Sequence, residues 1–539
     1  MQYKKRQSSK SFHMKYFIKT VVFILVGFIF LCVFEKILSH KWVYPRYIES
    51  AKNTFDEFYH MDAPDSIQAF FLGASNIEDS VDPMKIYQDC GVATFNLGTA
   101  AQSIQGSYYL LQELFNYYHP KYVFYDVSSL FVNSSNINMD SIIIDNLRLG
   151  RSKIEYVIYN PVMDKTPGIN TIINYLFSFF HYHSRWDSLG ELDFKLLGEN
   201  PHVNSYRKGY LNLIHIQKGW TDASLMNTMA LKEYTDVNGN IIIPDVREWN
   251  YNYLLKMIEL CKENKTALVL VKIPKIGSVD VGWTDIKSDI VKNIAVTNNI
   301  EYLDLLYDYD LSIDWEKDSY DGGEHMNYNG SRKVTAFFEE YLQNHFVPAI
   351  ENKDYESDLA IYDSICRVSD LVSSNSLFEF LQSLTQIDNT TIIISASDEM
   401  TNSLSEETIR RLEAIGIRTD LSKINYQDSF ISIINNGYVE YEEFSERKLY
   451  YESVIGSNKN LIVVSSGFMT GSQSQIKINW IDYSMNNRGL NIVVFDNKSG
   501  LVLDSVSFDT YSSDNPLAIR DYALEDKLYY EYQNWLMTN

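Results

Sequence analysis

The sequence predicts an α/β protein that has an N-terminal transmembrane helix and a second, β-rich domain near its C-terminus. Between residues 66 and 346, short apolar runs alternate with stretches whose apolar residues recur at helical spacing. From about residue 374 onward, apolar runs follow one another with turn signals between them. Because continuous apolar strands separated by helices are typical of a covered parallel sheet, we expect a three-layer α/β/α domain followed by an α+β domain.

Composition and charge narrow the possible functions. The chain has 539 residues, of which 45% are apolar and 22% charged, as in globular proteins. Its formal net charge of −23 repels phosphate backbones, so a nucleic-acid partner is not expected. The four cysteines are scattered and form no C-x-x-C pair, which argues against a disulfide framework and a structural zinc site. We expect no metal and no cofactor.

The N-terminus has the pattern of a membrane anchor. Residues 1–19 carry six basic side chains and no acid, and residues 20–34 carry no charge. We expect a cytoplasmic tail over 1–15 and a span over 16–38, with everything after residue 38 outside the cytoplasm. The alternative is a cleaved signal peptide, but no small-x-small cleavage site follows Phe34.

The elements of the first domain, residues 39–346, follow from the apolar runs. We expect buried strands at 69–73, 93–98, 122–126, 267–273 and 301–305, and helices at 103–117, 246–261 and 331–345. Residues 132–235 are rich in Tyr, Phe and Asn and fit this alternation poorly, so we interpret them as a helical insertion or cap. Residues 347–371 form an acidic connector with one expected helix.

The second domain is expected over residues 372–539. Its predicted helices are 376–384 and 404–416, and its first predicted strand is 391–397. Residues 428–443 predict a hairpin, because Asn436-Gly437 favours a tight turn between two apolar runs. Further strands are predicted at 461–467, 474–483, 490–496 and 501–509, the last two joined by 497–500.

Polar residues follow two of the predicted strands and one loop. Ser75 stands in Gly73-Ala74-Ser75-Asn76 at the end of the first strand, where ligands bind in open α/β sheets. Taken alone, such a serine is more often a helix cap. However, His325 and Asp321 share a loop before the last helix of the domain, and a serine nucleophile needs a base that an acid orients. The three residues therefore predict a nucleophilic serine site.

These segments resemble the SGNH hydrolases. The resemblance rests on LGASNIEDSVDP around Ser75, on NLGTAAQS, and on DGGEHMNYNGSRKVT around His325. More narrowly, they resemble DltD-like proteins, which are membrane-anchored and work beside a membrane-bound O-acyltransferase. The resemblance implies a flavodoxin-like fold over residues 66–346, with Ser75 as nucleophile, His325 as base and Asp321 as its acid.

The chain departs from that family at two points. The usual acid position, three residues before the histidine, holds Gly322, so Asp318 and Glu324 remain alternatives to Asp321. The G-x-N-D block that completes the oxyanion hole is replaced by Tyr125-Asp126-Val127-Ser128. By resemblance Gly98 donates its backbone N–H to the oxyanion, and Asn96 or Gln102 is the candidate for the second donor.

The second domain resembles the interleukin-like EMT inducer (ILEI/PANDER) domain, a lectin-like fold that also forms the stem of protein O-mannose N-acetylglucosaminyltransferase. RGLN at 488–491 and FDT at 508–510 carry the resemblance. The half around Asp398-Glu399 comes first here, which indicates a circular permutation. The resemblance implies carbohydrate binding, for which Trp480, Tyr483 and Tyr511 are the candidate platforms. The alternative is a spacer without a ligand.

Together these observations predict an extracytoplasmic O-acyltransferase that modifies a surface polysaccharide or teichoic-type polymer through an acyl-serine. Its expected partners are the membrane, a membrane-bound O-acyltransferase and the glycan acceptor. Acetyl is the expected acyl group, because nothing in the sequence indicates a long lipid pocket; D-alanyl is the alternative. Two other functions stay open: a carbohydrate esterase with the same triad, and a non-catalytic glycan-binding or assembly protein.

Overall fold

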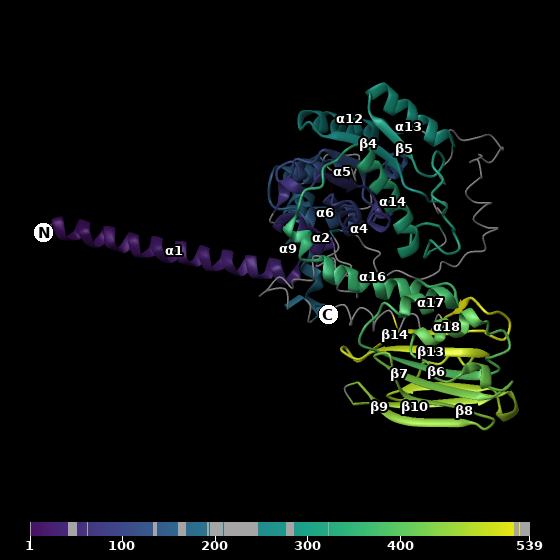
Figure 1. Cartoon of the computed structure of the whole chain (residues 1–539). Helices are drawn as coiled ribbons and strands as arrows, with labels where there is room; N and C mark the ends of the chain where they lie inside the picture. Colours follow the sequence, from purple (N-terminus) through teal and green to yellow (C-terminus); the bar gives the residue numbers. More distant parts are fainter. Residues whose placement is uncertain are drawn as a thin grey trace, which may run out of the picture.

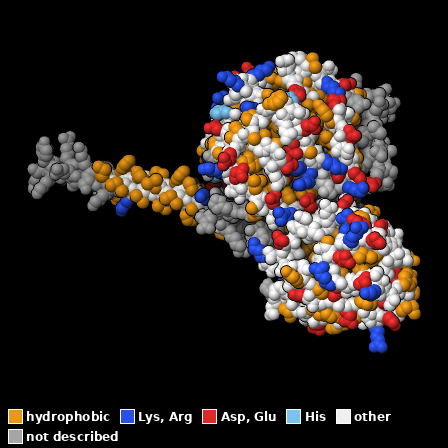
Figure 2. Space-filling view, in the orientation of Figure 1, with side chains coloured by type: hydrophobic (Ala, Val, Ile, Leu, Met, Phe, Trp, Pro, Cys, Tyr) orange, Lys and Arg blue, Asp and Glu red, His pale blue; other side chains and the backbone are white. Residues whose placement is uncertain are grey.

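The computed structural model shows an extended N-terminal helix followed by two packed domains (Figure 1). It describes residues 2–40, 51–61, 63–132, 137–159, 169–190, 193–194, 208–209, 246–275, 285–321, 323–456, 458–521 and 528. On the face that Figure 2 shows, the two domains mix acidic, basic and apolar side chains, whereas the described part of α1 carries an apolar band.

Helix α1 (Gln2–Leu38) contains the predicted span. Its segment Tyr16–Leu38 has a mean hydropathy of 2.7, and residues 16–34 are exposed, whereas Leu38 is buried against the first domain. The segment is long and apolar enough to be a membrane span or a signal sequence. After it, α2 (Ala51–His60) and η1 (Pro64–Ser66) lead into the first domain.

The first domain is built on a five-stranded parallel sheet in the order β2-β1-β3-β4-β5. Its strands are β1 (Ala69–Leu72), β2 (Thr94–Asn96), β3 (Tyr122–Asp126), β4 (Ala267–Lys272) and β5 (Glu301–Asp304). All five were predicted, to within two residues at each end. Parallel pairing brings their carboxyl ends to one edge of the sheet, which is where ligands bind in this kind of fold.

Helices cover both faces of this sheet. Phe71 and Phe124 pack with α3 (Ser75–Ser80), α4 (Pro83–Cys90) and α14 (Tyr328–Asn344) on one face. On the other face, Phe70 and Val123 belong to the core that includes α5 (Ile104–Leu114), α12 (Glu248–Glu263) and α13 (Asp285–Asn298). The side chains of neighbouring residues in one strand therefore pack on opposite faces of the sheet, and the predicted three-layer α/β/α arrangement is present.

The insertion is helical where the structure describes it. After η2 (Val127–Phe131) come α6 (Ile137–Asn146), α7 (Arg151–Tyr159), α8 (Ile169–Leu176), α9 (Ser178–Tyr182) and η3 (His183–Asp187). Most of the remaining insertion, including residues 210–235, lies outside the described residues.

The second domain has helices on one side of a β-sandwich. Helices α16 (Leu359–Ser373), α17 (Leu377–Leu384) and α18 (Glu406–Ala414) cover β6 (Thr390–Asp398), which is flanked by β7 (Ser429–Asn435) and β13 (Gly489–Asp496). The sheet continues through β8 (Tyr438–Ser445) on one side and β14 (Leu501–Phe508) and β15 (Ala518–Ile519) on the other. The predicted hairpin is present, with positive φ at both Asn436 and Gly437.

A second layer of strands belongs to the same ten-stranded sheet, because one of its strands pairs in parallel with the end of β6, and this layer closes the sandwich. It comprises β9 (Leu449–Ile455), β10 (Lys459–Gly467), β11 (Gln473–Ile478) and β12 (Ile481–Asp482). The prediction of one strand over 474–483 is wrong, because Asn479 and Trp480 take positive φ and turn the chain between β11 and β12. Strand β9 was not predicted: its solvent-facing residues interrupt the apolar run that marks a buried strand.

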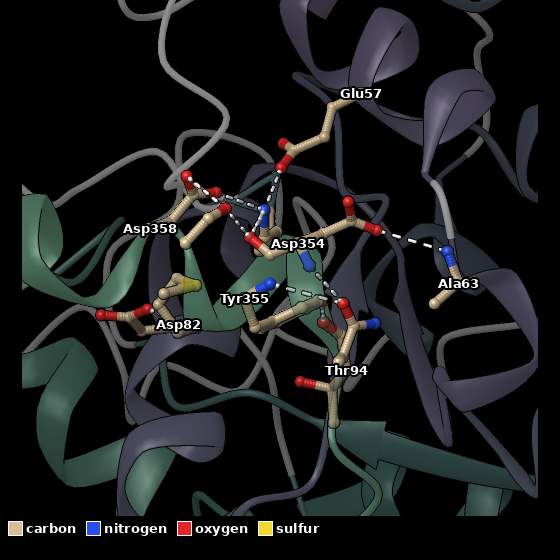
Figure 3. Close-up of polar contacts among 11 residues, drawn as sticks. Glu57, Ala63, Asp82, Thr94, Asp354, Tyr355 and Asp358 are labelled. Atoms are coloured by element: carbon tan, nitrogen blue, oxygen red, sulfur yellow. Dashed lines mark hydrogen bonds and ion pairs between the residues drawn. The ribbon is translucent and has the colours of Figure 1, made fainter.

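A buried ionic cluster joins four distant segments (Figure 3). Lys208, which is 1% exposed, lies 2.8 Å from Glu57 of α2 and 2.7 Å from Asp358, which precedes α16. The backbone carbonyl of Lys208 accepts a hydrogen bond from Asn96 at the end of β2. Beside it, the Tyr355 hydroxyl from α15 (Lys353–Glu356) donates to the Thr94 carbonyl. The cluster therefore fastens the insertion and both domains to the outer strand of the sheet.

We predict that Lys208→Met destabilises the protein by about 3–5 kcal/mol, because it removes the buried ammonium that pairs with the largely covered carboxylates of Glu57 and Asp358. Thermal unfolding followed by circular dichroism measures the change. The matched control is Lys498→Met, which removes an exposed lysine from a turn. Equal melting temperatures for the two variants would contradict the role of this cluster.

Candidate active site

Ser75 is aimed by a tight turn at the carboxyl end of β1. Gly73 has φ 149°, and a Cβ there would lie 2.9 Å from Asp126 Cβ. Ala74 is the N-cap of α3 and Ser75 is its first residue. The Ser75 side chain does not cap the helix. Its Oγ instead lies 2.7 Å from His325 Nε2.

Asp321 completes the line of side chains. Its Oδ2 lies 2.5 Å from His325 Nδ1, and its Oδ1 accepts the backbone N–H of His325 at 2.8 Å. A carboxylate can only accept a hydrogen bond, so Nδ1 of His325 carries the proton that it donates to Asp321. The lone pair of Nε2 then faces the Ser75 hydroxyl. Ser319 holds the loop, because its Oγ accepts the Gly323 N–H at 2.7 Å. This is the order of contacts that activates a serine.

The two alternative acids are engaged elsewhere. Asp318 is buried and pairs with Lys333 at 2.6 Å. Glu324 pairs with Lys275. Of the three candidates, the structure brings Asp321 to the imidazole.

A second carboxylate, which sequence reasoning missed, lies beside the histidine. Asp79 Oδ2 is 3.9 Å from His325 Nε2 and accepts the Tyr320 hydroxyl at 3.0 Å, while the Tyr320 ring stacks on the imidazole. Burial lowers the pKa of His325, but the hydrogen bond that His325 donates to Asp321 and the charges of Asp79 and Asp321 outweigh burial and raise this pKa above 6.5. The spacing of Asp79, four residues after Ser75 on one helix face, was the available signal.

The predicted oxyanion donors are wrong, because their N–H groups are already used. Asn96 Nδ2 donates to the carbonyls of Ile77 and Val81, and its Oδ1 accepts the Gly98 N–H at 2.9 Å. Gln102 Nε2 donates to the Leu97 carbonyl and to Thr99 Oγ1. These groups hold the β1 and β2 ends together and have no donor left for a substrate.

Free donors lie at the start of α3 instead. Within the described part of the chain, the backbone N–H groups of Ser75 and Asn76 make no hydrogen bond, as expected for the first residues of a helix. Both belong to the first turn of the helix that carries the reactive hydroxyl. This is a position where a helix start stabilises developing negative charge.

A buried lysine lies at the same edge of the sheet. Lys272 at the end of β4 donates to Ser128 Oγ at 3.0 Å, and Asn76 Nδ2 donates to the same oxygen at 3.3 Å. Burial lowers the pKa of Lys272 to about 8. Its position at the end of a predicted strand was visible in the sequence, but nothing there indicated that it faces Ser128. Among the described residues, no group of His, Cys, Asp and Glu is arranged to hold a metal ion.

The three candidate sugar platforms do not form one surface. Tyr483 is 3% exposed and belongs to the core of the sandwich, so its prediction as a platform is wrong. Trp480 is 73% exposed at the β11–β12 turn. Tyr511 follows β14 at the opposite end of the strands, where the Arg488 guanidinium lies 4.3 Å over its ring and pairs with Asp509 at 2.6 Å.

Comparison with known proteins identifies the second domain. The family model described as interleukin-like EMT inducer matches residues 358–437 and 488–526. The C-terminal region contains an interleukin-like EMT inducer domain. The match begins inside the segment predicted as a connector, so α16 belongs to the matched region. The circular permutation stays a prediction. No curated protein matches the chain.

Two solved structures are similar to part of the chain. A proposed acylhydrolase from Bacteroides fragilis is 12% identical, with a TM-score of 0.27 over 54% of this chain and 94% of that one. A GDSL-like lipase from Bacteroides thetaiotaomicron is 11% identical, with a TM-score of 0.27 over 56% of this chain and 100% of that one. A TM-score this low supports no conclusion about activity. The functional argument therefore rests on the geometry around Ser75.

We predict that kcat/KM for ester hydrolysis falls at acidic pH with an apparent pKa above the ordinary histidine value of 6.5. His325 must be neutral to act as a base, and its pKa is raised. This fall is called the acidic limb of the pH profile. Asp79→Asn removes one of the charges that raise this pKa, so the limb should move to lower pH. The pH profile of kcat/KM with a chromogenic acetate ester measures both effects.

The matched control for this prediction is Asp289→Asn, which removes an exposed carboxylate from α13. It should leave the limb in place. A limb that stays fixed in Asp79→Asn, or moves to higher pH, would contradict the electrostatic role of Asp79.

Proposed function

We propose that this protein is a membrane-anchored serine acyltransferase that places acyl groups, acetyl by preference, on hydroxyls of a surface glycan. The observation that carries the proposal is the contact order Ser75 Oγ, His325 Nε2, His325 Nδ1 and Asp321 Oδ2, with separations of 2.7 and 2.5 Å. Such a line of contacts activates a serine for acyl transfer. The apolar helix α1 supports the proposed location at a membrane. The C-terminal domain supports the proposal that the acceptor is a glycan.

In the first half-reaction, Ser75 Oγ attacks the acyl carbonyl and its proton passes to His325 Nε2. Asp321 holds the imidazole and stabilises its positive charge, which the nearby carboxylate of Asp79 also favours. The N–H groups of Ser75 and Asn76 stabilise the oxyanion. When the tetrahedral intermediate collapses, the bond to the leaving group breaks, the leaving group takes the proton from Nε2, and an acyl ester remains on Ser75.

In the second half-reaction, an acceptor hydroxyl gives its proton to His325 Nε2 and attacks the acyl-serine. The ester bond to Ser75 breaks, and the proton returns to Ser75 Oγ. A glycan hydroxyl as acceptor gives transfer, whereas water gives hydrolysis, so a carbohydrate esterase is the second candidate. A membrane anchor favours transfer, because it keeps the enzyme near a membrane-bound O-acyltransferase that supplies the acyl group.

The C-terminal domain is proposed to hold the glycan acceptor. The exposed pair Arg488–Asp509 and the neighbouring Tyr511 present charged donors and acceptors beside an aromatic ring, a combination that suits sugar hydroxyls and ring faces. The family match over 488–526 covers these residues. Trp480, at the other end of the strands, is a separate candidate for the same role.

We predict that Ser75→Ala and His325→Ala each lower acyl transfer to the glycan by about 10³-fold or more, because each removes a member of the nucleophile–base pair. The ester content of the surface glycan, measured by mass spectrometry in cells carrying each variant, gives the result. Ser357→Ala, which changes an exposed serine, is the control. Near-normal acylation in Ser75→Ala would rule out the enzymatic function.

We also predict that Tyr511→Ala raises KM for the glycan acceptor without changing kcat, because the residue binds acceptor and lies away from the chemistry. Trp480→Ala in the same assay decides which end of the domain binds. If neither variant changes KM, and the full chain with either change still retains the glycan in a pull-down, the domain is a spacer.

A further inference from the structure

The end of α1 is fastened to the insertion by several independent contacts. Arg185 of η3 donates from Nη1 to the carbonyls of Leu38 and Ser39, each at 2.9 Å. The Phe179 N–H in α9 donates to Glu35 Oε2 at 2.7 Å, and the Phe179 ring meets the edge of Phe34 at 6.4 Å. Figure 1 shows α9 beside the end of α1 where it reaches the first domain. The domain is therefore held in a fixed orientation relative to α1.

These contacts set the level of α9 relative to a bilayer. The 23-residue segment Tyr16–Leu38 is about 34 Å long at 1.5 Å per residue, slightly longer than the hydrocarbon core of about 30 Å. Phe34 lies about 6 Å before the end of that segment. The side chain that packs on Phe34 therefore lies near the boundary between acyl chains and headgroups.

Large aromatic side chains are exposed around this contact. Their exposed fractions are 50% for Phe177, 46% for Phe180, 72% for Trp186 and 52% for Phe194. Phe177 and Phe180 flank Phe179, Trp186 follows Arg185, and Phe194 follows Asp193, which pairs with Arg185 at 2.9 Å. Exposed apolar side chains gathered around one contact mark interaction surfaces. Aromatic rings are the side chains that bilayer interfaces favour. The surface formed by Phe177, Phe180, Trp186 and Phe194 is called the aromatic collar below.

We propose that the aromatic collar inserts into the headgroup–acyl boundary of the bilayer that α1 spans, as a second membrane contact. This inference rests on the proposed anchoring by α1. A lipid surface fits better than a protein groove, because the collar is continuous with the span and is held at the level where the span ends. Because α1 and the domain are fastened together, docking of the collar stops them from tilting as one unit in the bilayer, so that Ser75 keeps one orientation above the membrane.

The test uses the full chain reconstituted into pure phosphatidylcholine vesicles. A photoreactive benzoylphenylalanine replaces Phe180 or Trp186 in turn, and after irradiation mass spectrometry detects lipid adducts on the protein. Phe23 in the middle of α1 is the positive control, and Phe346, which is 91% exposed at the end of α14, is the negative control. We expect adducts at positions 23, 180 and 186, and none at 346.

Each other outcome overturns part of the account. Adducts at 23 without adducts at 180 and 186 would refute the collar and leave the anchor intact. No adduct at any position, 23 included, would refute the anchor and the collar together while leaving the chemistry at Ser75 untouched. If positions 180 and 186 crosslink to a protein in native membranes, and give no lipid adduct in vesicles, the collar docks a membrane protein instead.

Discussion

The close approach of α3 to the strand ends is the constraint on which the candidate active site depends. A Cβ at Gly98 would lie 2.6 Å from the backbone nitrogen of Glu78, and one at Gly73 would lie 2.9 Å from Asp126 Cβ. These two glycines let the helix start directly above the sheet edge, so that Ser75 projects toward the loop that carries His325. A side chain at Gly98 would push α3 outward, and one at Gly73 would clash with the end of β3. Either change would move the serine relative to its base.

Charge is concentrated around the imidazole in a way that suits a serine base. Asp321 orients His325 from one side, and Asp79 lies near the nitrogen that faces the serine. The raised pKa of His325 makes it a better proton acceptor, at the cost of activity in acid. Tyr320 shields one face of the ring from water and holds Asp79. Residues of α3 and of the loop before α14 therefore orient His325, raise its pKa and shield one face of its ring.

Much of this arrangement could be predicted from the sequence, and the rest could not for identifiable reasons. Apolar runs located all five strands of the parallel sheet, because buried strands need continuous apolar residues. The loop motif brought Asp321 and His325 together, and strand order brought them to Ser75. The oxyanion donors could not be predicted, because the sequence does not reveal that the side-chain N–H groups of Asn96 and Gln102 donate to neighbouring carbonyls. Tyr483 was one of three candidate platforms, yet after the turn at Asn479 and Trp480 its side chain lies in the core.

The central claim is that His325 activates Ser75 as a nucleophile, and covalent labelling tests it most directly. The full chain is treated with a fluorophosphonate, which reacts with activated serines, and the modified peptide is identified by mass spectrometry. The account predicts one adduct, on the peptide that contains Ser75, which is lost in His325→Ala and reduced in Asp321→Asn. An unmodified Ser75 in the wild-type chain, or equal labelling of Ser75 in His325→Ala, would contradict it.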